Sequence, residues 1–81
     1  MIFMDKKEKL QGRLGYNARN GRYGLLIFDL WKKEGFHCGD KMEVLIDGKW
    51  VETRMEMSLD RKWYLKGTLY YDDLEYLKVR V

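Results

Sequence analysis

Apolar and polar residues alternate along most of the chain with a period of two, the pattern of β-strands that bury one face. Gly, Asn and Asp residues, which favour turns, separate the alternating runs. No long stretch repeats apolar residues with the period of an α-helix. The pattern therefore predicts strands over residues 11–16, 22–28, 41–46, 49–58, 63–68 and 76–81.

The clearest turn is Asp47-Gly48, which lies between two apolar-rich runs and suits a two-residue hairpin loop. Such a loop would place Leu45 opposite Trp50 and Val44 opposite Val51. Because side chains alternate between faces, one face should be buried and the other mostly solvated. The expected core face comprises Met42, Val44, Val51, Thr53, Met55 and Met57. The expected solvated face comprises Lys41, Glu43, Leu45, Trp50, Glu52, Arg54 and Glu56.

Three segments have more than one interpretation. Residues 1–10 form an N-terminal extension that could be a short strand, a helical turn or a frayed end. Residues 29–39 could form a helical turn closed by Gly35, a long loop or an irregular strand. Residues 70–75 are acidic and rich in tyrosine, which indicates a connector or a single 3₁₀ turn.

A chain of 81 residues is enough for one small domain, which we expect over residues 11–81. The apolar share of 46% is typical of a folded chain, and the 15% of aromatic residues can fill a small core. Five or six short strands favour an all-β fold, a small and partly open barrel with at most one short helical turn. Closing the sheet in this way would remove exposed strand edges.

Charge is uneven along the chain. The net charge is +3, but residues 1–22 hold six basic and two acidic residues, a balance of +4. Such a basic end can attract phosphate or an acidic protein surface, or it can simply keep the chain soluble. Cys38 is the only cysteine, so the sequence holds no disulfide framework, and no run is long enough to span a membrane. We therefore expect a cytoplasmic protein that uses no membrane.

Several short motifs lie along the chain after Leu10. They are Gly12-Arg13-Leu14, Tyr16-Asn17, Arg22-Tyr23, Gly39-Asp40, Glu43-Val44, Gly48-Lys49-Trp50, Thr53-Arg54, Trp63-Tyr64-Leu65 and Leu77-Lys78-Val79-Arg80-Val81. Together they resemble a family of short uncharacterised domains of Gram-positive bacteria, their phages and their integrative elements. The resemblance implies an SH3-like barrel, although residues 29–35 look longer than the usual connection. It offers no catalytic residues, because the family has no assigned activity.

Candidate catalytic and metal-binding groups are few. His37 and Cys38 are adjacent, so on an extended chain they point apart and the histidine cannot easily activate the thiol. One cysteine and one histidine are also too few for a structural zinc site. Asp72, Asp73 and Glu75 lack a calcium-binding loop and are better interpreted as a solvated connector. We expect no enzyme activity, no metal and no cofactor.

Two hypotheses about function remain. The first is a non-enzymatic protein-interaction module that could be an accessory protein of a mobile element. Its unidentified protein partner would bind exposed aromatic residues. The residues proposed for this surface are Trp31, Leu45, Trp50, Tyr70 and Tyr71, which could alternatively cover a second small core. The second is a weak nucleic-acid binder. The residues proposed for it are Lys6, Lys7, Lys9, Arg13, Arg19 and Arg22.

Overall fold

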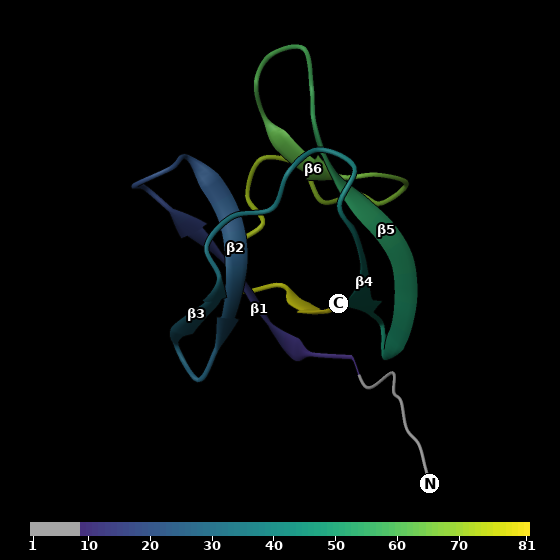
Figure 1. Cartoon of the computed structure of the whole chain (residues 1–81). Helices are drawn as coiled ribbons and strands as arrows, with labels where there is room; N and C mark the ends of the chain where they lie inside the picture. The colour runs from purple at the N-terminus through teal and green to yellow at the C-terminus, as the bar shows by residue number, and fades with distance from the viewer. Residues whose placement is uncertain (1–8) are drawn as a thin grey trace, which may run out of the picture.

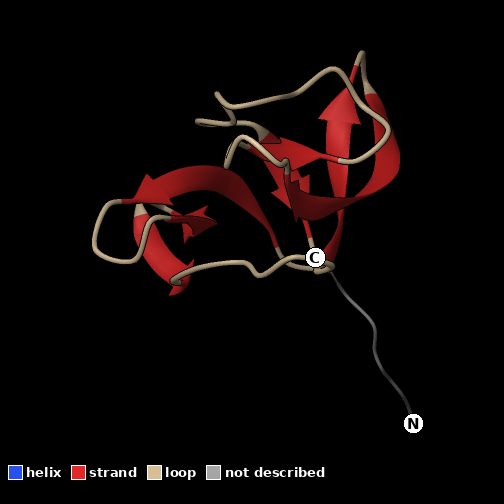
Figure 2. Cartoon of the chain, turned by 90° about the horizontal axis from the view of Figure 1, so that it is seen from above, coloured by secondary structure: helices blue, strands red, loops and turns tan. Residues whose placement is uncertain are grey.

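The structure is a computed structural model that describes residues 9–81. All regular elements in that range are β-strands, with no helix among them (Figures 1 and 2). The strands are β1 (Gln11–Asn17), β2 (Arg22–Ile27), β3 (Leu30–Lys33), β4 (Lys41–Ile46), β5 (Lys49–Met57), β6 (Trp63–Leu65) and β7 (Lys78–Arg80). They form one sheet in the order β3-β2-β1-β7-β4-β5-β6. The predicted all-β fold is confirmed, with seven strands in place of five or six.

The β4–β5 hairpin has the register that the Asp47-Gly48 turn predicts. Leu45 lies opposite Trp50 and Val44 opposite Val51, and both turn residues have positive φ. The core face is also confirmed for most of its length, since Met42, Val44, Thr53 and Met55 are buried. These alternating positions and the left-handed turn together fix the register of the hairpin.

Met57 is the exception on this core face, because its side chain is 37% exposed. The last residue of β5 that pairs with β4 is Arg54, so the end of β5 pairs with β6 alone. Met57 therefore lies beside the β5–β6 turn, beyond the part of the hairpin that the rest of the sheet covers. The prediction that Met57 belongs to the core was wrong for this reason.

The last strand in the sequence lies in the middle of the sheet. β7 pairs with β1 on one side and with β4 on the other. The two flanks of the sheet, β1–β3 and β4–β6, curl around the space between them (Figure 1). Trp63 Nε1 on β6 donates a hydrogen bond to the carbonyl oxygen of Gly21 at 2.8 Å, which joins the flanks at one end. The sheet therefore wraps around the core although its edge strands do not pair with each other.

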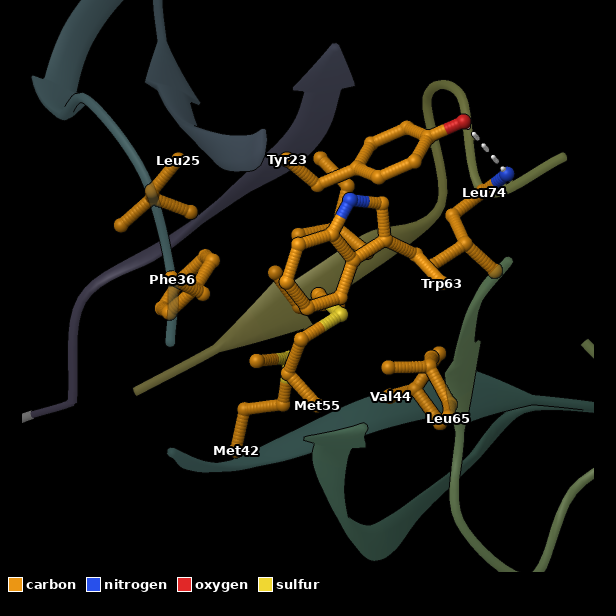
Figure 3. Packing of buried hydrophobic residues seen from close by; sticks show 11 residues of the cluster. Tyr23, Leu25, Phe36, Met42, Val44, Met55, Trp63, Leu65 and Leu74 are labelled. Atoms are coloured by element: carbon orange, nitrogen blue, oxygen red, sulfur yellow. Dashed lines mark hydrogen bonds between the residues drawn. The ribbon is translucent and has the colours of Figure 1, made fainter. Parts of the chain in front are cut away.

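The core lies on the inner face of this curled sheet, and Figure 3 shows its packing. Its buried apolar residues are Leu14, Tyr23, Leu25, Phe36, Met42, Val44, Met55, Trp63, Leu65, Leu74 and Val79. The hydroxyl of Tyr23 donates to the carbonyl oxygen of Asp72 at 3.1 Å and accepts from the amide of Leu74 at 3.2 Å. Burial raises the pKa of Tyr23, and its two hydrogen bonds tie the C-terminal connector to β2.

The segment that follows β2 contains a short strand, which was one of the three predicted interpretations. β2 ends at Ile27, and Phe28 and Asp29 form a two-residue turn into β3. Both turn residues have positive φ, 52° and 62°, although neither is glycine. The helical turn proposed here was therefore wrong, and the irregular strand is confirmed, because the pairing of β3 with β2 shifts register between Leu25 and Leu26. The absence of the usual Gly or Asn signal concealed this hairpin.

The connector between β6 and β7 forms no helix, and an isolated bridge between Tyr64 and Tyr71 ties it to β6. The strand predicted over residues 63–68 ends at Leu65, and the last strand is shorter than predicted. Leu74 in this connector is fully buried, although its acidic neighbours gave no indication of a core position in the sequence. The connector is therefore part of the core as well as a link.

Candidate functional site

The aromatic residues proposed for a protein interface do not form one surface. Trp31 lies on the edge strand β3, whereas Leu45 and Trp50 face each other in the β4–β5 hairpin. The guanidinium of Arg80 lies 4.3 Å from the centre of the Trp50 ring and covers part of it. Trp31 and Trp50 thus belong to opposite flanks of the sheet.

The two proposed tyrosines lie at a third place, beside β6. Tyr70 is partly buried and packs against the core. The hydroxyl of Tyr71 donates to the carboxylate of Asp60 at 2.6 Å, which raises the pKa of Tyr71. Hydrogen bonds from the hydroxyls of Ser58 and then Tyr71 lower the pKa of Asp60. This contact ties the connector to the β5–β6 turn, so both tyrosines have structural contacts.

The basic residues proposed for nucleic-acid binding are also dispersed. Lys6 and Lys7 lie outside the described residues. Lys9 Nζ lies 2.6 Å from the carboxylate of Glu43, on the β4 side of the sheet. Arg19 lies in the exposed β1–β2 turn.

Two of these arginines make contacts that stabilise the fold. Arg22 Nη1 donates to the carbonyl oxygen of Phe36 at 3.2 Å, and its guanidinium lies over the Trp63 ring. Arg13 Nη1 donates to the carbonyl oxygen of Tyr76 at 3.0 Å, but its side chain stays on the outer face of β1. Of the four basic residues that the structure describes, Arg13 alone lines the groove described below.

Strand pairing places four side chains in one row on the outer face of the sheet. Arg13 on β1 lies opposite Lys78 on β7 and opposite Leu26 on β2. Leu26 in turn lies opposite Trp31 on β3. Directly opposite residues share a face, so the four form a row that runs from two cations to two apolar side chains. We call Lys78, Arg13, Leu26 and Trp31 the outer row.

Glycines allow the apolar end of the outer row to pack closely. A Cβ atom on Gly15 would lie 2.4 Å from Leu26 Cδ1 and 3.5 Å from Trp31 Cη2. A Cβ atom on Gly24 would lie 2.3 Å from the carbonyl oxygen of Lys33. Leu26 and Trp31 therefore cover the bare backbone of Gly15 on β1, and the backbone of Lys33 and Glu34 covers Gly24 on β2. This covered second face agrees with the apolar character of both faces of β2.

A groove of about 510 Å³ lies beside Lys78, Arg13 and Leu26 of the outer row, near the β2–β3 turn, and Trp31 is not among its lining residues. The β2–β3 turn projects at the lower left of Figure 1. We call this groove the outer groove. Its lining residues are Gln11, Gly12, Arg13, Leu26, Ile27, Phe28, Asp29, Tyr76 and Lys78. It combines apolar and aromatic walls with two cations and one carboxylate, which is a lining suited to a partner segment of mixed character.

Two aromatic residues of the outer groove are exposed and have unusual backbone conformations. Phe28 is 94% exposed with a φ of 52°, and Tyr76 is 60% exposed with a φ of 64°. Bulky side chains rarely adopt positive φ, which costs on the order of 1–2 kcal/mol per residue. Neither exposed ring gains compensating burial, so packing within the domain does not explain either residue. Strain of this kind is typical of binding surfaces.

His37 and Cys38, which were considered for catalysis and metal binding, lie in one turn. The amide of His37 donates to the carboxylate of Asp40 at 2.8 Å, and Cys38 is exposed in the same turn. Within residues 9–81, no group of three or more histidine, cysteine or acidic side chains could hold a metal ion.

The acidic connector likewise stays within its own turn and the neighbouring strand. The amide of Glu75 donates to the carboxylate of Asp73, and the amide of Tyr16 donates to the carboxylate of Glu75. These contacts agree with the predicted role of a connector.

A family model described as a domain of unknown function (DUF5348) matches residues 12–81. The matched range contains all seven strands apart from the first residue of β1. Neither the curated proteins nor the solved structures contain a match to the chain. Among the described residues, no helix has the length and apolar character needed to cross a membrane.

Proposed function

Since the chain belongs to the family of domains of unknown function DUF5348, we propose a function from its own surface. It is a non-enzymatic protein-interaction module whose outer groove binds an acidic segment of a partner protein. The module has an SH3-like arrangement of strands and works in the cytoplasm, where the exposed thiol of Cys38 stays reduced. An accessory role in a mobile element agrees with its small size.

The single observation that carries this proposal is the exposure of Phe28 at the strained β2–β3 turn. A bulky ring at positive φ lowers the stability of the free domain, and here 94% of its surface is exposed. A partner that covers the ring would recover apolar burial at about 25 cal/mol per Å². Exposed aromatic residues beside a groove are typical anchors of protein interfaces.

Charge indicates the character of the partner. Arg13 and Lys78 lie opposite each other at one end of the groove, and Asp29 is the only acidic residue among the lining residues within 9–81. A partner segment with a carboxylate at this end and an apolar side chain near Phe28 would match the groove. A second copy of the chain is a poorer match, because its described groove lining offers one carboxylate, Asp29, for two cations, Arg13 and Lys78.

The test is selection of peptides from a random display library on the immobilised full chain, followed by titration calorimetry of the selected peptides. We expect acidic residues spaced a few positions from an apolar residue. Phe28→Ser should weaken binding by about tenfold or more, as loss of an interface anchor does. Leu59→Ser is the matched control, because Leu59 is an exposed apolar residue of a turn outside the groove.

Two results would overturn the proposal. The first is selection that yields no enrichment of acidic peptides. The second is equal affinity of the selected peptides for the wild type and Phe28→Ser. Size-exclusion chromatography with light scattering should show a monomer, and a dimer abolished by Phe28→Ser would assign the groove to self-association.

The alternative is weak nucleic-acid binding. One observation favours it: Arg13 and Lys78 lie in one groove with two exposed rings, a mixture that can contact phosphates and stacked bases. The test is a salt titration of the full chain with single- and double-stranded DNA and RNA. An absence of binding at low ionic strength would exclude this function.

A further inference from the structure

A second groove, of about 550 Å³, lies on the other flank of the sheet and shares no lining residue with the outer groove. We call it the cationic groove. Its lining residues are Lys9, Lys41, Met42, Glu43, Glu52, Thr53, Arg54, Lys66, Arg80 and Val81. Five of these side chains are cationic and two are acidic, so the groove has a net positive charge.

One carboxylate neutralises one half of the groove. Glu43 Oε1 lies 2.6 Å from Arg80 Nε and 2.6 Å from Lys9 Nζ. These hydrogen bonds, from Arg80 first and from Lys9 second, lower the pKa of Glu43 to about 2. Glu43 therefore stays ionised and pairs with two cations. In this half of the groove, the protein's own carboxylate is the anion that the cations bind.

The other half holds three cations close together. Lys41 lies directly opposite Arg54 in the β4–β5 pair. The amide of Lys66 donates to the carbonyl oxygen of Arg54 at 3.1 Å, which places Lys66 beside the same arginine. Like charges directly opposite each other destabilise a strand pair. These three neighbouring positive charges therefore do not stabilise the pairing of the strands that carry them.

Few carboxylates compensate these three cations. Arg54 Nε lies 2.8 Å from a carboxylate oxygen of Glu56, but this buried nitrogen has no hydrogen bond of acceptable direction. Among residues 9–81, neither Lys41 nor Lys66 lies within 4.0 Å of a carboxylate. An anion between the three side chains would gain charge-assisted hydrogen bonds and relieve their repulsion.

We propose that the cationic groove binds a phosphate-bearing ligand through Lys41, Arg54 and Lys66. A phosphate group carries several acceptor oxygens and can contact an arginine and two lysines at once. The volume of the groove leaves room for more of the ligand than a single phosphate. This site is independent of the protein interaction proposed for the outer groove. Of the basic residues considered in the sequence, Lys9 lines the same groove but pairs with Glu43 and is not one of the three proposed ligands.

The test uses three probes on the full chain, followed by NMR amide shifts and calorimetry at low ionic strength. The probes are sodium pyrophosphate, a short oligothymidylate and sodium acetate as the non-phosphate control. We expect saturable binding of pyrophosphate, with the largest shifts at Lys41, Arg54 and Lys66. Tighter binding of the oligothymidylate would identify a nucleic acid as the source of the phosphate, and equal binding would identify a small phosphate ligand.

The matched variants remove equal charge at different places. Lys41→Gln with Lys66→Gln removes two cations from the groove, whereas Lys32→Gln with Lys49→Gln removes two exposed lysines that line neither groove. The first pair should weaken pyrophosphate binding by about tenfold or more, because each lysine would supply a charge-assisted hydrogen bond to the ligand. The second pair should leave affinity within about twofold of the wild type, since distant exposed charges are screened.

Three outcomes would overturn the proposal. They are no binding of either phosphate probe, equal weakening by both variant pairs, and acetate binding at the same residues with the same affinity. Phe28→Ser distinguishes the phosphate site from the proposed peptide site, because it should leave pyrophosphate affinity unchanged while it weakens peptide binding. Failure of one site therefore leaves the other site testable.

Discussion

Replacement of Phe28 by asparagine should make the domain more stable and the proposed protein interaction weaker. Phe28 has a φ of 52° in the two-residue turn between β2 and β3. Asparagine adopts this left-handed conformation more readily than a bulky residue does, because its short polar side chain can bond locally. The change therefore removes backbone strain at a position where a turn needs positive φ.

The magnitude follows from two opposing terms. The left-handed conformation costs a bulky residue on the order of 1–2 kcal/mol, and asparagine avoids a large part of this cost. Loss of packing is small, because Phe28 is 94% exposed. We expect a net gain of about 1 kcal/mol in the free energy of unfolding, which corresponds to about 4–8 °C in Tm for a domain of this size.

The assay is urea denaturation followed by tryptophan fluorescence, with calorimetry for Tm. The midpoint should rise at an unchanged slope, which assigns the effect to stability. Leu59→Asn is the control, because Leu59 is also fully exposed but does not have positive φ. Its free energy of unfolding should stay within about 0.5 kcal/mol of the wild type.

A Phe28→Asn variant that is no more stable than the wild type would refute the strain argument. A variant that is more stable and still binds the selected peptides with full affinity would refute the assignment of Phe28 to the interface. The combination that we expect, greater stability with weaker binding, is the usual signature of a residue retained for function at a cost in stability.

Three further predictions concern the fold. Gly24→Ala should lower the free energy of unfolding by about 2 kcal/mol or more, because its Cβ would lie 2.3 Å from the backbone oxygen of Lys33, and an unchanged urea midpoint would contradict this packing. Leu74→Ala should cost about 2–5 kcal/mol despite its place in a connector, and a loss below about 1 kcal/mol in the same assay would show that the connector is not part of the core. Glu43 contributes stability that is fully present above its unfolded pKa of 4.5 and is lost as pH falls through its folded pKa of about 2. The stability difference between wild type and Glu43→Gln should therefore shrink between those values, and a constant difference across urea titrations at each pH would exclude the ion pairs with Arg80 and Lys9.

Only part of the candidate site could be predicted from the sequence. Trp31 and Arg13 were each proposed for a binding surface, but for different ones, and strand pairing places both in the outer row. Phe28 was interpreted as the end of a strand, since a phenylalanine gives no signal for a left-handed turn. The last strand was predicted to begin at Tyr76, but β7 begins at Lys78, and Tyr76 lies exposed in the turn before it. Its positive φ had no signal in the sequence.

The sequence by itself determined the local structure wherever one residue type has one favoured conformation. Asp47-Gly48 specifies a left-handed two-residue turn, and the alternation around it then fixes both the register and the buried face of β4 and β5. The turn, the register and the buried face depend on residues within a few positions of each other, so the residue pattern is enough to predict them.

Only the tertiary structure decided which distant segments meet. β7 lies between β1 and β4, which brings Lys78 beside Arg13, and the end of β6 brings Lys66 beside Arg54. Leu74 became a core residue because the curled sheet leaves space that a connector must fill. Contacts of this kind depend on the summed packing of many residues, and no single motif in the chain encodes them.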